Sequence, residues 1–467
     1  MRLNAKSLIP TVLVLLAVPV LLLFGLNLIL QTPSVQERIH ASLEKSIGMP
    51  ISLAGISVTS CGGIKVREVS SKSENGPHFA FDSLILYPCY LKLLQGEIVI
   101  RKLALQHPVI RYSMADSAAV HSLPAQQNIT VTSSIQQALT QPPVANSLSS
   151  SSPTSGTPSL PATSGKILRT LPLLTMTDGE VALLNGENLP IALAQGMNLT
   201  GKSLSDGSSK GWLTAAQVTG GSSLIVHDLS SSITLSSDGA TLTLGNLIAT
   251  LGGGKLTGDF SLALPPSAPQ YKTQLALAGA SLNQFFLDAS LGNCATEGAV
   301  SGNLQLSGIA GTPQSMEGKG NLLCTNAVIQ PADFLKQIGQ ILQIQELQIL
   351  RLAEGKVLFR IHQGDVQIDQ LTLRSDNLIL AAQGPVHSNG DLDLQARLLF
   401  NQQLTGRLHG FLGPQLTQAP EAGYSQVVFH VSGPAKSPKT DLLERLTGIR
   451  INGDLGGLLQ GLFGRPR

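Results

Sequence analysis

Charged and aromatic residues are scarce in this sequence. Asp, Glu, Lys and Arg make up only 13% of the 467 residues, and Phe, Trp and Tyr make up 4%. The formal net charge is +2, so the protein has neither a strong long-range field nor a basic surface, and we expect no nucleic-acid partner. A surface with so few charges must consist largely of Ser, Thr, Asn and Gln.

The motifs of metal sites are also missing. The sequence has no H-E-x-x-H motif and no C-x-x-C spacing, and its nine His residues are scattered along the chain. Zinc sites are usually built from such closely spaced ligands, so we expect no metal site.

Two glycine-rich segments match catalytic patterns by their letters. Residues 196–203, GMNLTGKS, fit the phosphate-loop pattern, and residues 207–211, GSSKG, fit the nucleophile-elbow pattern around Ser209. Both patterns need a helix directly after the motif, and neither following segment favours one. We interpret the first segment as a turn between strands and the second as a loop, and we expect no cofactor and no enzymatic activity.

Four cysteines are present. Cys61 and Cys89 lie in the N-terminal part, and Cys294 and Cys324 lie in the C-terminal part. In an oxidising compartment one disulfide within each part is one interpretation, and four buried thiols are the other. The sequence leaves both the oxidation state and the pairing open.

A long apolar segment stands near the N-terminus. Residues 7–30 contain no charged residue and as a helix are long enough to cross a bilayer. No small-residue cleavage site follows, so we predict an uncleaved transmembrane anchor. Arg2 and Lys6 precede it, which predicts that residues 1–6 are cytoplasmic and that the body of this single-pass protein is exported. Apolar residues at every fourth position in residues 35–47 predict an amphipathic helix after the anchor.

The chain divides around an uncharged linker. Residues 117–165 contain no Asp, Glu, Lys, Arg or aromatic residue and are rich in Ser and Pro, so they cannot build a core. We therefore expect an N-terminal domain at 31–116, a flexible linker at 117–165, a β-rich body at 166–440 and a Gly-rich amphipathic tail at 441–467.

Alternation of apolar and polar residues dominates both structured parts. Such alternation is typical of a strand with one dry face and one wet face. The dry-face side chains are Leu392, Leu394, Ala396, Leu398 and Phe400 in one strand and Leu256, Phe260, Leu262 and Leu264 in another. Such a face is either buried in a closed core or exposed as a channel that contacts lipid, and the sequence does not separate the two.

Short strands separated by Gly-rich turns predict a mainly β, antiparallel sheet with a few short helices. The segment SNGD at 388–391 is typical of a hairpin turn. Residues 331–342, PADFLKQIGQIL, predict one short helix that is capped by Asp333. Its apolar face would carry Phe334, Ile338, Ile341 and Leu342.

The order of these features resembles the AsmA-like family of inner-membrane-anchored periplasmic proteins, which is related to lipid-transport proteins of the TamB and YhdP type. Residues 41–56, 62–70 and 81–112, after the anchor, are similar to the opening domain of that family. Residues 318–338, 359–398 and 431–440 are similar to its closing domain. The chain departs from the long lipid-bridge members in being short and in carrying the uncharged linker.

This resemblance implies an elongated, curved sheet whose apolar groove holds lipid acyl chains and serves outer-membrane lipid homeostasis. We therefore expect a non-enzymatic protein of the inner membrane, with its body in the periplasm. Its expected partners are phospholipid or other acyl chains, the membrane and envelope proteins. The alternative is a scaffold that assists outer-membrane protein assembly and carries no lipid.

Overall fold

The computed structural model describes most of the β-rich body. The described residues are 50–59, 62–71, 78–89, 100–113, 173–185, 189–221, 224–264, 269–292, 295–331, 333–341, 343–408, 416–435 and 437–447, with Thr32 and Glu37. The predicted anchor, the helix after it, the linker and the end of the tail lie outside them. Within these ranges, every helix falls short of the length or apolarity that a membrane crossing requires.

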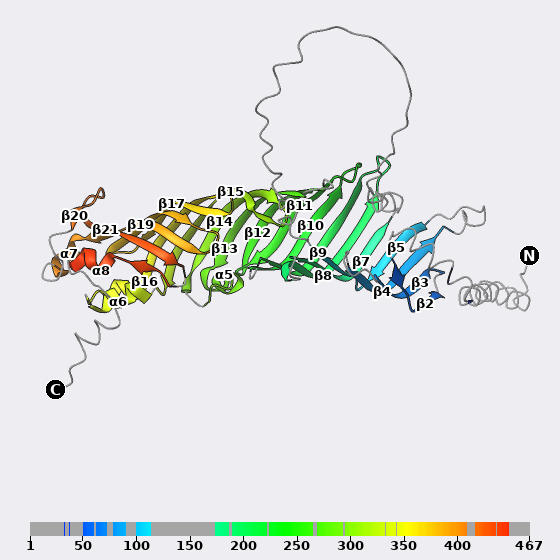
Figure 1. Cartoon of the computed structure of the whole chain (residues 1–467), viewed down its shortest axis with the longest axis horizontal. Helices are drawn as coiled ribbons and strands as arrows, with labels where there is room; N and C mark the ends of the chain where they lie inside the picture. Colours follow the sequence, from blue (N-terminus) through cyan, green and yellow to red (C-terminus); the bar gives the residue numbers. More distant parts are fainter. Residues whose placement is uncertain are drawn as a thin grey trace, which may run out of the picture.

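The described chain forms one long sheet of 22 strands (Figure 1). The first strands are β1 (Ile51–Ser52), β2 (Gly55–Val58), β3 (Ile64–Ser71), β4 (His78–Pro88), β5 (Ile100–Gln106) and β6 (Val109–Ser113). The next are β7 (Leu174–Leu184), β8 (Pro190–Ser203), β9 (Ser209–Gly220), β10 (Leu224–Leu235), β11 (Thr241–Leu251), β12 (Gly254–Ala263) and β13 (Gln270–Ser281). The last are β14 (Ala295–Ile309), β15 (Thr312–Ile329), β16 (Leu350–His362), β17 (Asp365–Arg374), β18 (Leu378–Val386), β19 (Asp391–Asn401), β20 (Thr417–Gln418), β21 (Tyr424–Pro434) and β22 (Lys439–Thr440).

The sheet is mixed, which corrects the expectation of a purely antiparallel one. From β7 to β19 each strand pairs antiparallel with the next strand of the sequence, as a meander does. However, β5 and β6 both pair parallel with β7. Parallel neighbours need a long connection, and residues 114–172 provide one. The N-terminal strands and the large body therefore share a single sheet.

Short helices gather on one long side of this sheet, where strands β13, β15 and β19 end. They are α5 (Leu282–Asp288) between β13 and β14, α6 (Asp333–Ile341) and the 3-10 helix η2 (Gln345–Leu347) between β15 and β16, and α7 (Gln402–Leu408) after β19. We call this side the helix edge, by which we mean a row of strand ends and not an edge strand. The opposite edge, where tight turns join β8 to β9, β10 to β11, β16 to β17 and β18 to β19, is the hairpin edge. A further helix, α8 (Leu442–Thr447), packs on β21.

The short helix predicted in residues 331–342 is confirmed as α6, but Asp333 is its first residue and not the residue that caps it. Asp333 begins the helix, and Lys336 contacts its carboxylate at 3.3 Å. Ile338, which we placed on the apolar face, is fully buried. Leu335, which the sequence analysis did not place there, is buried as well. The side chains of Phe334, Ile341 and Leu342 lie outside the described residues.

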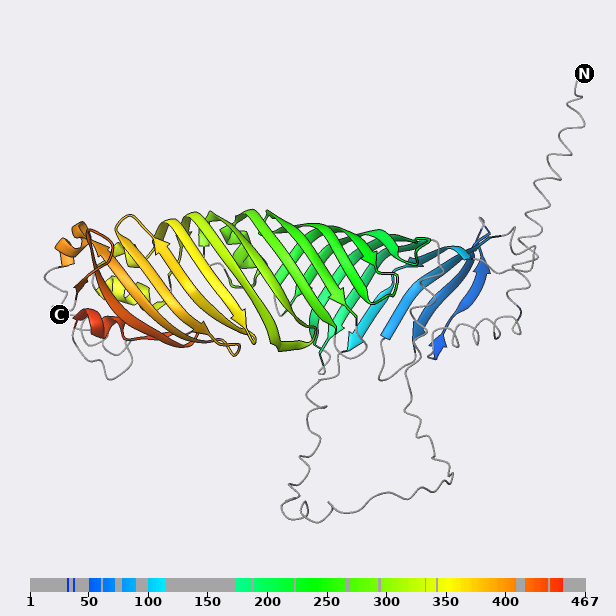
Figure 2. The same ribbon diagram turned by 90° about the horizontal axis from the view of Figure 1, so that it is seen from above.

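Irregular pairing bends the strands. Register shifts occur between β10 and β11, β11 and β12, and β13 and β14, next to Asp228, Asn246 and Gly279, which have positive φ values of 51°, 51° and 63°. Bulges of this kind increase the twist of a strand and bend it locally. In Figure 2 the strands run obliquely to the long axis, and the elongated sheet curls.

Gly258 marks a place where neighbouring strands approach closely. A methyl group at this position of β12 would collide with the backbone carbonyl of Gln274 on β13. We expect Gly258→Ala to lower the free energy of unfolding by about 1–3 kcal/mol, the usual cost of overpacking. Denaturant titration followed by circular dichroism measures this change.

Gly220 provides the control for that substitution. A methyl group there would meet no atom within 4 Å. Gly220→Ala should therefore change the free energy of unfolding by no more than about 0.5 kcal/mol. Equal effects at the two glycines would contradict the close approach of β12 and β13.

Candidate functional site: the two faces of the sheet

One face of the sheet carries an unbroken row of uncharged residues. Residues that pair directly across strands point to the same face, so the row can be followed through the registers. It begins with Val58, Ile64, Leu86, Leu103, Leu174, Gly201 and Gly211. It continues through Ile233, Leu244, Phe260, Thr273, Leu306, Gly318, Ile361, Val366, Val386 and Leu392. We call these residues the open row.

The open row joins the two strands that the sequence analysis singled out. Phe260 of β12 and Leu392 of β19 are both members, although more than a hundred residues separate them in the sequence. The predicted apolar residues of β12 and β19 therefore lie on the same face of one sheet. Every member of the row is half-buried except Ile361, which is buried.

Exposure on this face falls from the hairpin edge toward the helix edge. On β12, Phe260 and Leu262 are half-buried and Leu256 is buried, while Leu264, the residue after the strand, is 41% exposed. On β19, Leu392 is half-buried, whereas Leu394, Ala396, Leu398 and Phe400 are buried. These buried residues belong to one apolar cluster. The cluster also contains Leu335 and Ile338 of α6, Ile344 just before η2, Leu347 of η2, Leu404 of α7, and Leu442 and Leu446 of α8.

This gradient divides the predicted lipid-facing residues into two groups. Leu256, Leu394, Ala396, Leu398 and Phe400 belong to a closed core, because other side chains cover them. Leu392, Phe260, Leu262 and Leu264 stay partly or well exposed to solvent. The open part of the apolar face thus lies toward the hairpin edge.

A small cavity lies on the open part between β7 and β11. Its volume is about 190 Å³, and Leu174, Gly201, Gly211 and Ile233 of the open row line it. Leu199, Leu235 and Leu242 line it as well. Lys202 and Lys210 also line it, but they neighbour Gly201 and Gly211 in the strands, so their side chains point to the opposite face. The side chains on this face are uncharged, so the cavity suits an apolar group.

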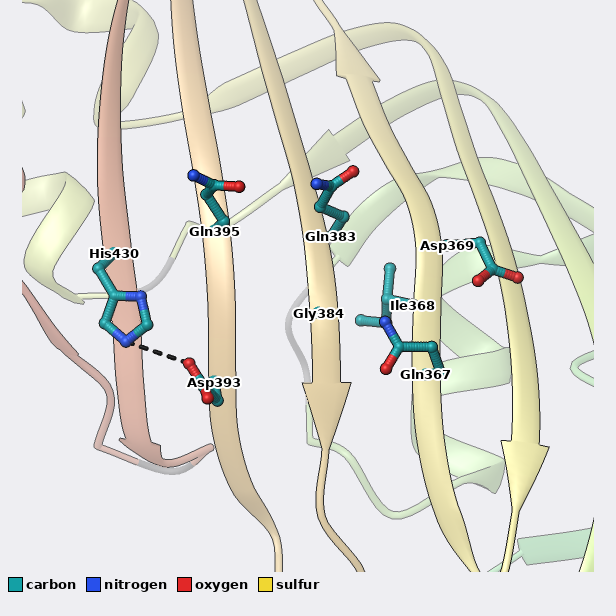
Figure 3. A pocket seen from close by; sticks show the side chains of 8 residues that line it. All are labelled: Gln367, Ile368, Asp369, Gln383, Gly384, Asp393, Gln395 and His430. Carbon is teal, nitrogen blue, oxygen red and sulfur yellow. Dashed lines mark ion pairs between the residues drawn. The ribbon is translucent and has the colours of Figure 1, made fainter.

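The opposite face is polar and carries a hollow over β17, β18, β19 and β21 (Figure 3). Two adjoining cavities, of about 410 and 540 Å³, share Asp369, Gln383 and Gln395 in their linings. We call their combined lining the polar hollow. Gln383 lies directly opposite Gln395, which in turn lies opposite His430, so these side chains form a cross-strand row.

Two of the acidic groups that line the polar hollow, Asp369 and Asp393, each contact a basic side chain. Arg360 donates Nε–H to Asp369 Oδ2 at 2.8 Å and Nη2–H to Oδ1 at 2.6 Å, and these hydrogen bonds hold the pKa of Asp369 below its usual 3.8. His430 Nε2 lies 3.2 Å from Asp393 Oδ1 (Figure 3). Both carboxylates therefore already have a cationic or hydrogen-bonding neighbour.

The first catalytic-pattern segment lies wholly in a strand, which corrects our interpretation of it as a turn, whereas the second begins in a turn and ends in a strand, so its interpretation as a loop holds only for its first two residues. Residues 196–203 belong to β8, and Lys202 pairs opposite Lys210 of β9. In GSSKG, Gly207 is in the turn and Ser209 already begins β9. The side chains alternate in burial along these strands, but the glycines hide this alternation in the sequence. The sequence therefore did not indicate that the segments are strands. Neither segment is followed by a helix, as both catalytic patterns require.

The cysteine predictions stay open. Cys89 and Cys324 have free thiols among the described residues, while Cys61 and Cys294 lie outside them. Cys324 pairs opposite Val300 within the apolar cluster, and burial raises the pKa of its thiol. In the described ranges, no group of three His, Cys, Asp or Glu side chains is arranged to hold a metal ion.

Sequence reasoning missed two parts of these surfaces. It did not place Gly201, Gly211 or Gly318 on the apolar face, because glycine gives no hydropathy signal. It also did not align the polar residues Asp393, Gln395 and Arg397 of β19 with those of the neighbouring strands, although alternation on β18 and β21 could have indicated them. Compared with known proteins, the chain matches no protein-family model and no curated protein sequence.

Proposed function

We propose that this protein binds lipid acyl chains along the open row and is held at a membrane by its N-terminal segment. The observation that carries the proposal is the row itself, which crosses every strand from β2 to β19 except β6 without a charged side chain. A half-exposed apolar surface of this length is unusual on a protein that has only water as its neighbour.

The dimensions of the row suit several acyl chains in line. At about 4.8 Å per strand, the row extends for roughly 80 Å along the sheet. The chains of one bilayer leaflet span about half of a 30 Å hydrocarbon core, or roughly 15 Å. The row is thus several times longer than one chain. This geometry favours movement of lipid along the sheet over storage of a single molecule.

The resemblance to the AsmA-like family and the apolar residues 7–30 support a location for this activity. We place the anchor in an inner membrane and the sheet in the periplasm, where the protein would contribute to outer-membrane lipid homeostasis. No enzymatic step is needed for this function, because lipid transfer along an apolar surface changes no covalent bond.

Site-specific photocrosslinking of the full-length protein in cells tests this function. A photoreactive amino acid at position 262 points into the open part of the apolar face, whereas one at position 261 points to the other face. We expect mass spectrometry to find lipid attached at position 262 and not at position 261. Equal crosslinking at both positions, or none at 262 with the protein intact, would overturn the proposal.

A further inference from the structure

The polar hollow has the size of a ligand site. It lies on the face opposite the open row. Its two cavities, of about 410 and 540 Å³, are in the range of small-ligand sites. A wall bounds it on one side, because Ala419 and Tyr424 around β20 pack over Ile379 and Leu399 on this face. Glu421 from the same connection lines the larger cavity.

The amide groups of the hollow are available to a ligand. Within the described chain, no intramolecular hydrogen bond engages the side chains of Gln367, Gln383 or Gln395. Each amide offers both a donor and an acceptor. Gln383 and Gln395 lie directly opposite on adjacent strands, so their amides repeat at the strand spacing of about 4.8 Å.

The charged groups of the hollow disfavour an anionic ligand. Arg360 already binds Asp369 in a two-bond pair, and His430 already contacts Asp393. The larger cavity adds one cation, Arg397, and one anion, Glu421. The carboxylates of Asp369, Asp393 and Glu421 outnumber the guanidinium groups of Arg360 and Arg397, so an anionic ligand would find no excess of positive charge here, and burying an unpaired ion is costly.

Apolar groups complete the floor of the larger cavity. Ile379, Ala381 and Val428 line it beside Gln383 and Gln395. Val428 is 39% exposed, so its methyl groups are accessible. A ligand that fits must therefore present hydroxyl or amide groups at repeated intervals together with C–H faces.

From this combination we infer that the polar hollow binds an uncharged oligosaccharide. The hydroxyl or acetamido groups of successive sugar rings bond to the amides of Gln383 and Gln395, and the C–H faces lie on Val428 and Ala381. The spacing between adjacent strands is comparable to the length of one pyranose ring, so neighbouring rings meet equivalent amides. This site lies on the face opposite the open row and does not depend on lipid binding.

Binding of two tetrasaccharides to the full-length protein in detergent tests the inference. One is the β-1,4-linked tetramer of N-acetylglucosamine, and the other is the β-1,4-linked tetramer of glucose. We expect saturation-transfer NMR and calorimetry to detect binding of at least one of them. The double substitution Gln383→Ala with Gln395→Ala should weaken that binding about tenfold or more, because it removes both adjacent amides.

A second pair of glutamines provides a matched control. Gln274 of β13 and Gln305 of β14 are also exposed and directly opposite each other, but neither lines the hollow. Gln274→Ala with Gln305→Ala should leave sugar affinity unchanged. Failure of both sugars to bind, or an equal loss with both pairs of substitutions, would overturn the inference. Lipid crosslinking at position 262 is measured separately, so either proposal can fail alone.

Discussion

Replacing Leu398 with Asp should unfold the C-terminal half of the sheet. Leu398 is fully buried, and it lies opposite Leu380 on one side and Val427 on the other. A buried charge without a partner costs about 3–5 kcal/mol or more, which is a large part of the stability of an ordinary domain.

Chemical denaturation and protease resistance measure the effect at Leu398. Arg397→Asn is the control, because Arg397 is exposed on the opposite face and is adjacent in the sequence. This control should change the free energy of unfolding by about 0.5 kcal/mol or less. A stably folded Leu398→Asp protein would show that the face under α7 and α8 is open and not closed.

Two charges on the open part of β12 should have the opposite outcome. Phe260 and Leu262 are half-buried, so water can still solvate a carboxylate at either position. We expect the protein with Phe260→Asp and Leu262→Asp to remain folded, within about 1–2 kcal/mol of the unchanged protein. Its bound lipid should fall sharply, since each Asp in contact with hydrocarbon costs about 2.5–3.5 kcal/mol.

Quantitative lipid mass spectrometry of the purified protein, together with circular dichroism, checks this expectation. Ser261→Asp is the control, because Ser261 lies between the two positions and points to the polar face. It adds one of the same charges and should change neither fold nor lipid content. Unchanged lipid in the doubly charged protein would contradict the proposed function.

The sequence predicted those features that depend on neighbouring residues. Alternation placed Leu392, Leu394, Ala396 and Leu398 on one face of a strand, and the registers of β19 with β18 and β21 confirm it. The SNGD hairpin turn is confirmed between β18 and β19, where Gly390 donates its N–H to the backbone carbonyl of His387. The short helix at Asp333 is confirmed as well.

Features that depend on distant residues were predicted less well. The segment at 196–203 was expected to be a turn, but pairing with β7 and β9 holds it in an extended strand. The parallel pairing of β5 and β6 with β7 was not foreseen, because a register between segments separated by residues 114–172 has no local signal. The polar hollow was missed for the same reason, since four strands contribute to it.

The sequence by itself determined that this protein is mainly β and that its strands have one apolar face, because side chains alternate along a strand whatever its neighbours are. Only the tertiary structure decided which apolar residues are covered. Leu262 and Leu398 have the same local pattern, yet Leu262 is half-buried and Leu398 is fully buried. The difference arises because residues of α6, α7 and α8 join the cluster around Leu398, and none of them is adjacent to it in the sequence.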